Sequence, residues 1–410
     1  MDEFLRPIAE RLPSYIRDTT DFIQRMKVLG KLPVECYLVK LHVSSLYTNI
    51  DIDEGLTVVQ EELMKTDRVK PSPQTLTCLL EKVLRLNNFT FNDEHFIQIK
   101  GTAMRTRVAP NFANVYMGRF EENFVYKTEW SNHVIIWVRF IDDIFLIWKG
   151  DRDSLTEFTD HLNNAAPSIK FTHEISTNSV TFLDTTVLTD RQGNINTDVY
   201  QKPTDTHPHL DWTSAHPPHL KQSIPYSQAL RLRRTCSSTD TLKKRITEYA
   251  DFFVVCGYQR TKVLREMQKV LAMAQGQCLQ TRERESTDRI PLPTTFNPHT
   301  TFIAETARRN WNFLKSKERL AHIFNNPPLV AYRRRMSLRD RLVSTLTTLL
   351  NQEAAKHAEN QSVAGAKKST KPPHLLAVTT ITPSKYSTLQ TVSHHGLFTL
   401  FSVISANYST

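Results

Sequence analysis

The stretch VIIWVRFIDDIFLIW, residues 134–148, limits what this chain can fold into more than any other segment. Two runs rich in β-branched and aromatic residues flank the adjacent carboxylates of Asp142 and Asp143, and such runs are typical of buried strands. Strands interrupted by Asp-Asp predict a hairpin with its turn at the acidic pair, which pushes the carboxylates out of an apolar sheet at one edge. Carboxylate oxygens suit Mg²⁺, which binds one or two carboxylates together with substrate phosphates. Because an isolated Asp-Asp pair is more often a solvated turn, the metal-site hypothesis depends on the rest of the chain.

The remaining segments predict an α+β fold with antiparallel pairing. An apolar strand covers residues 36–43 and leads into a helix with Asp51 or Asp53 as its N-cap. The other predicted helices cover residues 1–30, 75–86, 109–126, 155–165 and 302–324, and the other predicted strands cover 89–100 (a hairpin), 169–175, 180–188, 195–201, 290–296 and 329–333. This order of strand, helices, hairpin, helix and strands is that of an α+β layer.

The composition is that of a globular protein with two or three domains, because 410 residues are too many for one ordinary core. The five cysteines are odd in number and form no CxxC pair, which argues against a zinc ribbon and a disulfide framework and makes a reducing compartment the default. No run of eighteen apolar residues is present, and the N-terminus has early acids without an apolar core. The sequence therefore predicts no membrane span and no secretory signal peptide.

The positive charge belongs to one part of the chain. Residues 217–345 contain 24 Lys and Arg against 10 Asp and Glu, whereas the rest contains 28 against 32. Three predicted amphipathic helices after residue 217 carry many of these cations. Such a concentration indicates a surface that binds a polyanion, with a solvated helical exterior as the alternative.

Three motifs occur in a fixed order: LVKLHVSSLYTNI, QIKGTAMRTRVAPNFANVYMG and RFIDDIFLIW. Together they resemble the palm of reverse transcriptases, specifically those of Penelope-like retroelements. The resemblance continues through SIKFTHEI, TFLDTTV and VYQKPTDTHPHLDWTSAHPPHL and covers roughly residues 1–345. It implies a reverse-transcriptase palm followed by a basic helical thumb. It also implies an RNA-directed DNA polymerase that uses an RNA template, a DNA primer, deoxynucleoside triphosphates and Mg²⁺ or Mn²⁺, and a nuclear location.

The resemblance places one catalytic position at His42. Nucleotide transfer to a primer end uses two metal ions about 4 Å apart, and these need carboxylates from two different strands. Asp142 and Asp143 supply one side as catalytic and metal-binding residues, and the family has an aspartate where this chain has His42. Neutral imidazole is a poor ligand for Mg²⁺ because hard ions select oxygen. The sequence therefore predicts that His42 faces Asp142 within metal-bridging reach, and that the chain extends primers poorly.

Further roles in nucleotide binding follow from the resemblance. The matching positions are Tyr47 under the incoming sugar, Gln98, Gly101, Ala109 and Pro110 beneath the template and nucleotide, Arg105 where the family usually has glycine, and Lys170 as a proton donor to pyrophosphate. Tyr47 read without its motif is better explained as a core tyrosine. Lys170 is better explained as a solvated strand lysine.

The resemblance and the charge together assign the nucleic-acid-binding residues. They are Lys202, which with Trp212 resembles the primer grip, and Arg231, Arg233, Arg234, Lys243, Lys244 and Lys262 of the basic helices. His207, His209, His216 and His219 raise the question of zinc, but their loop is rich in proline and lacks a cysteine, which favours solvated histidines.

These observations divide the chain into five parts. They are a helical lead-in (1–30), the palm (31–216), the thumb (217–285), a helical and strand extension (286–345) and a tail without periodicity that we expect to be disordered (346–410). Most of the fingers and a GIY-YIG endonuclease are expected to be missing. Two alternatives stay open: a nucleic-acid-binding remnant without catalysis, and a telomerase-like primer extender. No protein partner is inferred.

Overall fold

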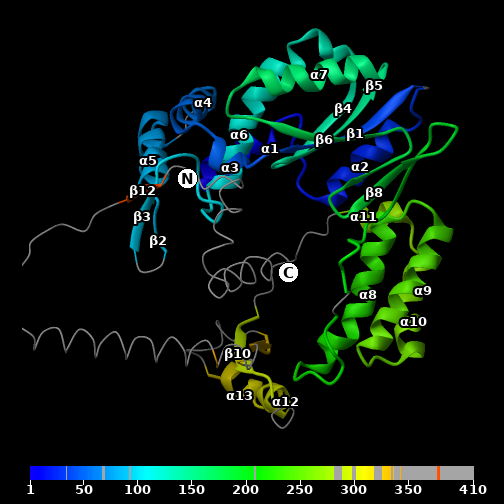
Figure 1. Cartoon of the computed structure of the whole chain (residues 1–410). Helices are drawn as coiled ribbons and strands as arrows, with labels where there is room; N and C mark the ends of the chain where they lie inside the picture. Colours follow the sequence, from blue (N-terminus) through cyan, green and yellow to red (C-terminus); the bar gives the residue numbers. More distant parts are fainter. Residues whose placement is uncertain are drawn as a thin grey trace, which may run out of the picture.

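The N-terminal part of the chain is built around a four-stranded antiparallel sheet (Figure 1). This computed structural model describes residues 1–33, 35–66, 70–91, 94–206, 209–280, 289–297, 302–317, 326–333, 336, 342 and 376–378. The strands of the sheet, in spatial order, are β4 (Val134–Phe140), β5 (Asp143–Lys149), β1 (Cys36–Val43) and β6 (Phe171–Ser176). The predicted strand at 36–43, the Asp-Asp hairpin and the α+β class are therefore confirmed.

The two faces of this sheet are buried in different cores, because successive side chains of a strand point to opposite sides. On one face Val39, Leu41 and Leu146 pack against helices. These helices are α1 (Asp2–Glu10), α3 (Leu46–Asn49), α4 (Ile52–Met64), α5 (Pro73–Arg85), α6 (Ala109–Glu121) with its π-helical continuation Glu122–Tyr126, and α7 (Arg152–Ala165), with a 3₁₀ turn at Glu129–Asn132 before β4. Asp51 caps α4, as one of the two predicted alternatives.

The opposite face is covered over only part of its length. Leu38, Phe145 and Ile147 pack against α2 (Thr19–Leu29) and a second sheet. That sheet has the order β7 (Ser179–Phe182), β8 (Thr185–Thr189) and β9 (Ile195–Val199). The single strand predicted at 180–188 is wrong, because the chain reverses at Leu183, where φ is +54°, and forms a hairpin instead.

The basic part of the chain begins with a helical bundle that has its own core. The helices are α8 (Pro218–Thr235), α9 (Thr239–Val255), α10 (Arg260–Gln268), a 3₁₀ turn at Lys269–Ala272 and α11 (Gln275–Leu279). Leu232, Leu242, Phe253 and Met267 are buried between them. The three predicted amphipathic helices after residue 217 are thus confirmed.

Smaller elements complete the described part of the chain. They are the hairpin β2 (Asn88–Phe91) and β3 (Glu94–Gln98), the parallel pair β10 (Pro291–Thr295) and β11 (Leu329–Arg333), the helices α12 (Phe302–Arg309) and α13 (Trp311–Lys315), and the strand β12 (Leu376–Val378) beside β3. The helix predicted at 302–324 is thus two short helices up to residue 315. Residues 346–410, predicted to be disordered, lie outside the described residues except for β12, which that prediction did not include. Within the described residues, no helix is long and apolar enough to cross a membrane.

Candidate active site

The register of β1 and β5 brings His42 and Asp143 together. The two residues are directly paired across antiparallel strands, so their side chains lie on the same face of the sheet. His42 Nδ1 and Asp143 Oδ1 are 3.0 Å apart. This is the face that α2 and the second sheet cover only in part, and the two side chains retain 45% and 29% of their exposure. Both polar groups therefore lie at the open end of a face whose other end is buried.

The turn of the hairpin adds Asp142 to this pair. Ile141 has a φ of +58°, which turns the chain between β4 and β5, and the Asp142 carbonyl accepts a hydrogen bond of 2.8 Å from the amide of Val43. Ligand atoms of His42, Asp142 and Asp143 all lie within 4.8 Å of one another. The structure thus brings together the three residues predicted to form the catalytic site, although His42 is paired with Asp143 rather than with Asp142. Their catalytic role stays a prediction.

The electrostatics of the site are those of two crowded carboxylates. Burial raises the pKa of Asp142, and the neighbouring Asp143 raises it further. Two cations oppose this shift: His42, when protonated, and Lys40, which lies two residues before His42 and so on the same face of β1. Sequence reasoning missed Lys40, which its spacing of two from His42 could have indicated.

The donor set fits one hard divalent cation better than two. The carboxylates of Asp142 and Asp143 offer the oxygens that Mg²⁺ and Mn²⁺ prefer. His42 offers nitrogen in place of a bridging carboxylate, and this nitrogen is already within hydrogen-bonding distance of Asp143. The residues present therefore do not fit a pair of ions bridged from both strands.

A buried ion pair supports the hairpin from the other face of the sheet. The side chains of Arg139 and Glu121 are 0% and 1% exposed, and Arg139 Nε donates to Glu121 Oε1 at 2.6 Å. Arg139 also donates to Asn114 Oδ1 at 2.6 Å and to the Ile141 carbonyl at 3.3 Å. Since Ile141 precedes Asp142, Arg139 is a positioning residue for the turn. Sequence reasoning missed it, although a charge inside an apolar strand signals a buried partner.

The backbone of Gly101 lies against the backbone of Tyr47. Tyr47 is half-buried at the edge of the helix-covered core. Gly101 has a φ of +70°, and a side chain there would come within 2.3 Å of the Tyr47 carbonyl oxygen. Thr102 N donates to the same oxygen at 2.7 Å. The missing side chain of Gly101 thus leaves room for the backbone of Tyr47 and Thr48, and the roles of Tyr47 and Gly101 toward a nucleotide stay predictions.

The other predicted nucleotide contacts have partners within the protein or lie open. Gln98 accepts from Asn87 at 2.9 Å and donates to the Lys100 carbonyl at 2.8 Å, within its own hairpin. Lys170 donates to the Asn163 and Ala166 carbonyls at the end of α7. Pro110 lies in the first turn of α6, beside Ala109, and Arg105 is exposed. Their roles toward a nucleotide stay predictions.

The predicted nucleic-acid-binding cations fall into two groups. The arginines of α8 are engaged: Arg231 pairs with Asp184 at 2.9 Å, Arg233 donates to the Met273 carbonyl at 2.7 Å and Arg234 to the Cys278 carbonyl at 2.8 Å. The lysines are exposed, namely Lys202, Lys243, Lys244 and Lys262, although Lys243 also pairs with Asp240 at 3.5 Å. If this surface binds a polyanion, the lysines are the groups available to it.

The histidines of the proline-rich loop do not share one environment. His209 stacks on Phe253 with ring centroids 4.2 Å apart, so the prediction of a solvated side chain is wrong there. His216 lies 3.2 Å from the Ser214 hydroxyl, and His219 is exposed. His207 lies outside the described residues.

Comparison with known proteins gives one family match and several distant structural similarities. Residues 209–268, which include the whole of α8, α9 and α10, match the animal helix-turn-helix domain family. No curated protein sequence matches this chain. Telomerase from Candida albicans in complex with a fragment of telomeric RNA is similar at a TM-score of 0.49 and 9% identity, over 79% of this chain and 55% of that one.

Two other structures extend this range. Apo telomerase from Candida tropicalis is similar at a TM-score of 0.41 and 11% identity, over 80% of this chain and 59% of that one. The RNA-dependent RNA polymerase 3Dpol of a sicinivirus is similar at a TM-score of 0.40 and 14% identity, over 63% of this chain and 55% of that one. This chain spans little more than half the length of each of these three. The three TM-scores are all below 0.5, so these similarities say nothing about what this chain does.

Proposed function

We propose that this chain is the palm and thumb of a Penelope-like retroelement reverse transcriptase, an RNA-directed DNA polymerase that acts in the nucleus. Its substrates are deoxynucleoside triphosphates and a DNA primer on an RNA template. The observation that carries the proposal is the convergence of His42, Asp142 and Asp143 within 4.8 Å on one open face of an antiparallel sheet. A solvated Asp-Asp turn does not require a polar residue from another strand to meet it, whereas nucleotidyl transfer does.

The same observation implies that polymerisation is slow in this chain. A divalent cation bound by Asp142 and Asp143 would stabilise negative charge on a phosphoryl group. His42 withholds the carboxylate that would bridge to a second ion. Losing a group that stabilises the transition state by several kcal/mol lowers the rate by at least about a thousandfold.

A nucleic-acid-binding remnant is the second candidate, and the surroundings of His42 favour it. His42 lies 3.0 Å from Asp143, and Lys40 lies on the same face near Asp142. Side chains of the protein thus already offset part of the acidic charge that would hold metal ions. In that case, the basic bundle retains its affinity for nucleic acid while the sheet no longer supports catalysis.

Primer extension in Mg²⁺ and in Mn²⁺ tests the two candidates. The proteins compared are the unaltered chain, His42→Asp, and His42→Asp combined with Arg105→Gly. We expect His42→Asp to increase the extension rate by at least about a thousandfold, because the new aspartate on β1 gives the site a third carboxylate beside Asp142 and Asp143. Asp142→Asn in the His42→Asp background is the matched control and should abolish the gain.

Each other outcome decides a different point. Rapid extension by the unaltered chain would contradict the assignment of His42 as a disabling residue. Primer–template binding without extension by any variant would favour the remnant. If no folded variant bound the primer–template or extended the primer, the polymerase assignment would be overturned.

A further inference from the structure

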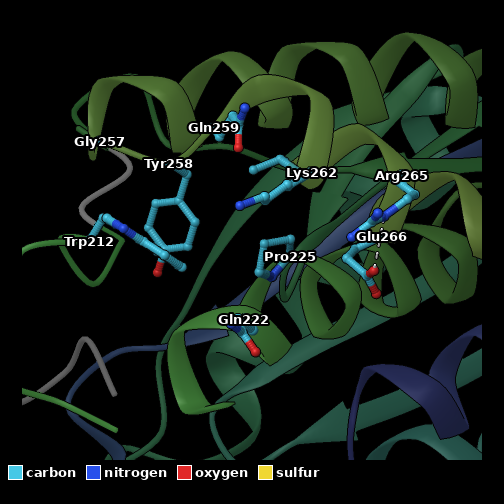
Figure 2. Close-up of a pocket in the computed structure, with 10 residues that line it drawn as sticks. Trp212, Gln222, Pro225, Gly257, Tyr258, Gln259, Lys262, Arg265 and Glu266 are labelled. Atoms are coloured by element: carbon cyan, nitrogen blue, oxygen red, sulfur yellow. Dashed lines mark ion pairs between the residues drawn. The ribbon is translucent and has the colours of Figure 1, made fainter. Parts of the chain in front are cut away.

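The cluster of His42, Asp142 and Asp143 does not fit two bridged Mg²⁺ ions, which raises the question of which ion it does fit. Among the described residues, it is the one group of three His, Cys, Asp or Glu side chains whose ligand atoms lie within 4.8 Å of one another. The cavity of the helical bundle (Figure 2) has one carboxylate in its lining, Glu266, which already pairs with Lys269 at 2.5 Å. A cation therefore finds its donors at the sheet and not in the bundle.

The spacing of the donors fits a single ion. His42 Nδ1 and Asp143 Oδ1 are 3.0 Å apart. Neighbouring donors on one ion with bonds of about 2.0–2.2 Å are about 3.0–3.4 Å apart, so an ion can contact both atoms without a shift of the strands. The carboxylate of Asp142, whose ligand atom lies within 4.8 Å of both, completes a set of three protein donors.

The charge of the site also fits a single ion. The carboxylates of Asp142 and Asp143 carry two negative charges, which one divalent cation neutralises. The ammonium group of Lys40, on the same face of β1, already stabilises the ionised carboxylate of Asp142. A second divalent cation would therefore enter a site without negative charge left to hold it.

The nitrogen of His42 decides which kind of ion is preferred. Imidazole is a good ligand for Zn²⁺ and other transition ions, whereas Mg²⁺ selects oxygen. Three protein donors with a further position open to water are typical of zinc sites in enzymes. The site has room for such a position, because the side chains of His42 and Asp143 are 45% and 29% exposed.

We propose that His42, Asp142 and Asp143 bind one transition-metal ion of the zinc type, in preference to Mg²⁺. Strand β1 supplies the nitrogen, and the hairpin turn between β4 and β5 supplies both carboxylates. The proposal rests on the proposed function in that it names the ion of the same site. Binding of the ion itself requires neither primer nor nucleotide.

A hydrogen bond without a metal ion is the alternative use of the contact between His42 and Asp143. In that case Nδ1 of His42 donates to Asp143, and the pair has no preference for a transition ion. The substitution His42→Asn distinguishes the two uses, because asparagine retains a donor for Asp143 but lacks the imidazole nitrogen.

The test measures metal binding to the full chain, freed of metal ions by a chelator, without primer or nucleotide. Co²⁺ is titrated because its visible absorption reports its donors, and Zn²⁺ or Mg²⁺ is then added as a competitor. We expect one Co²⁺ per chain, which Zn²⁺ displaces and which Mg²⁺ at a roughly hundredfold higher concentration does not. This readout needs no variant.

The variants then assign the binding to the cluster. His42→Asn should weaken Co²⁺ binding at least about tenfold, since losing even a group that only orients a ligand costs about 10–100-fold. His42→Asp, which replaces nitrogen by oxygen, should lower the ratio of Co²⁺ to Mg²⁺ affinity at least about tenfold. The matched control is His173→Ala, because His173 is exposed and pairs with Leu41, which places it on the opposite face of the sheet from His42. It should change the Co²⁺ affinity less than about twofold.

The outcomes separate this proposal from the polymerase function. Displacement of Co²⁺ by Mg²⁺ at equal concentration would overturn the proposal. So would an unchanged Co²⁺ affinity in both His42 variants with unchanged circular dichroism, and either result would leave the polymerase function standing. Co²⁺ binding that depends on His42, in a protein that neither binds a primer–template nor extends it in any variant, would support the proposal and contradict only the polymerase function.

Discussion

At the scale of single residues, the most consequential group outside the acidic cluster is the Arg139–Glu121 pair beneath the hairpin. Both side chains are fully buried, so removing one of them leaves an uncompensated charge in the core. We expect Arg139→Met to lower the free energy of unfolding by about 3–5 kcal/mol, measured by denaturant titration. It should also reduce any activity of a His42→Asp background, because Arg139 holds the Ile141 carbonyl next to Asp142.

The double variant Arg139→Met with Glu121→Gln distinguishes the cost of an unpaired buried charge from the cost of lost packing. Removing both charges should cost clearly less than the sum of the single substitutions, since no unpaired ion remains. Additive losses would mean that the two side chains contribute through packing alone.

Because the pKa of Asp142 is raised, we expect the stability of the protein to depend on pH. This pKa is raised by burial and by Asp143, so the folded state holds the proton to a higher pH than the unfolded state. Stability should then fall as pH rises from the unfolded value of about 3.9 through the folded pKa. Asp142→Asn removes this penalty, so it should raise Tm at pH 7, with a gain that shrinks toward pH 4.

Asp190 provides a control of opposite sign. Its pKa is lowered by hydrogen bonds from Asn194, so ionised Asp190 is favoured by folding. Asp190→Asn should lower Tm at pH 7. If Asp142→Asn lowered Tm as Asp190→Asn is expected to do, the assignment of the Asp142 shift to burial would fail.

At the scale of elements, the segment after β3 must approach the segment after β1 closely, and Gly101 permits this. A Cβ at Gly101 would meet the backbone of Tyr47 and Thr48, which cannot move as a flexible side chain does. Gly30, the C-cap of α2, has a similar φ of +65° but no atom within 4 Å of a built Cβ. We expect Gly30→Ala to cost about 1–2 kcal/mol through φ alone, and Gly101→Ala about 1–3 kcal/mol more through the clash.

Denaturant titrations of the two variants measure this difference. Equal losses of unfolding free energy in the two variants would show that the two segments can move apart without an energetic cost. A loss of primer–template affinity in Gly101→Ala without a loss of stability would instead favour the ligand-facing role implied by the family resemblance.

At the scale of the whole molecule, charge is divided between a mildly acidic sheet region and a basic bundle. Nucleic-acid binding through the bundle should therefore weaken steeply with salt, with a slope of about −0.9 per phosphate contact on a log–log plot for duplex DNA. Neutralising the exposed Lys243 and Lys244 should reduce this slope by up to about two contacts. Arg234→Met should chiefly lower stability, because this side chain already donates to the Cys278 carbonyl.

Filter binding or fluorescence anisotropy at several salt concentrations measures the slope. A slope near zero would contradict nucleic-acid binding by the bundle. A larger change in slope from Arg234→Met than from the lysines would show that the arginines of α8 leave their internal partners on binding.

The sequence alone determined the local elements and the motif order. Apolar runs and their periodicity predicted β1, the Asp-Asp hairpin, α6 and the basic helices, because these patterns reflect burial within a single element. It failed at residues 180–188, where one continuous β-like run contains a turn at Leu183 that no glycine or proline marks. Turns of this kind depend on the packing of the two flanking strands rather than on local composition.

Only the tertiary structure decided which residues meet. The β1–β5 register pairs His42 with Asp143, and a slip of one residue would have turned His42 into the helix-covered core. The internal partners of Arg139, Arg231 and Arg234 are likewise set by contacts between segments far apart in the chain. The sequence shows how many charged side chains the chain has. Whether each of them is already paired within the protein or still available to a ligand depends on the three-dimensional packing.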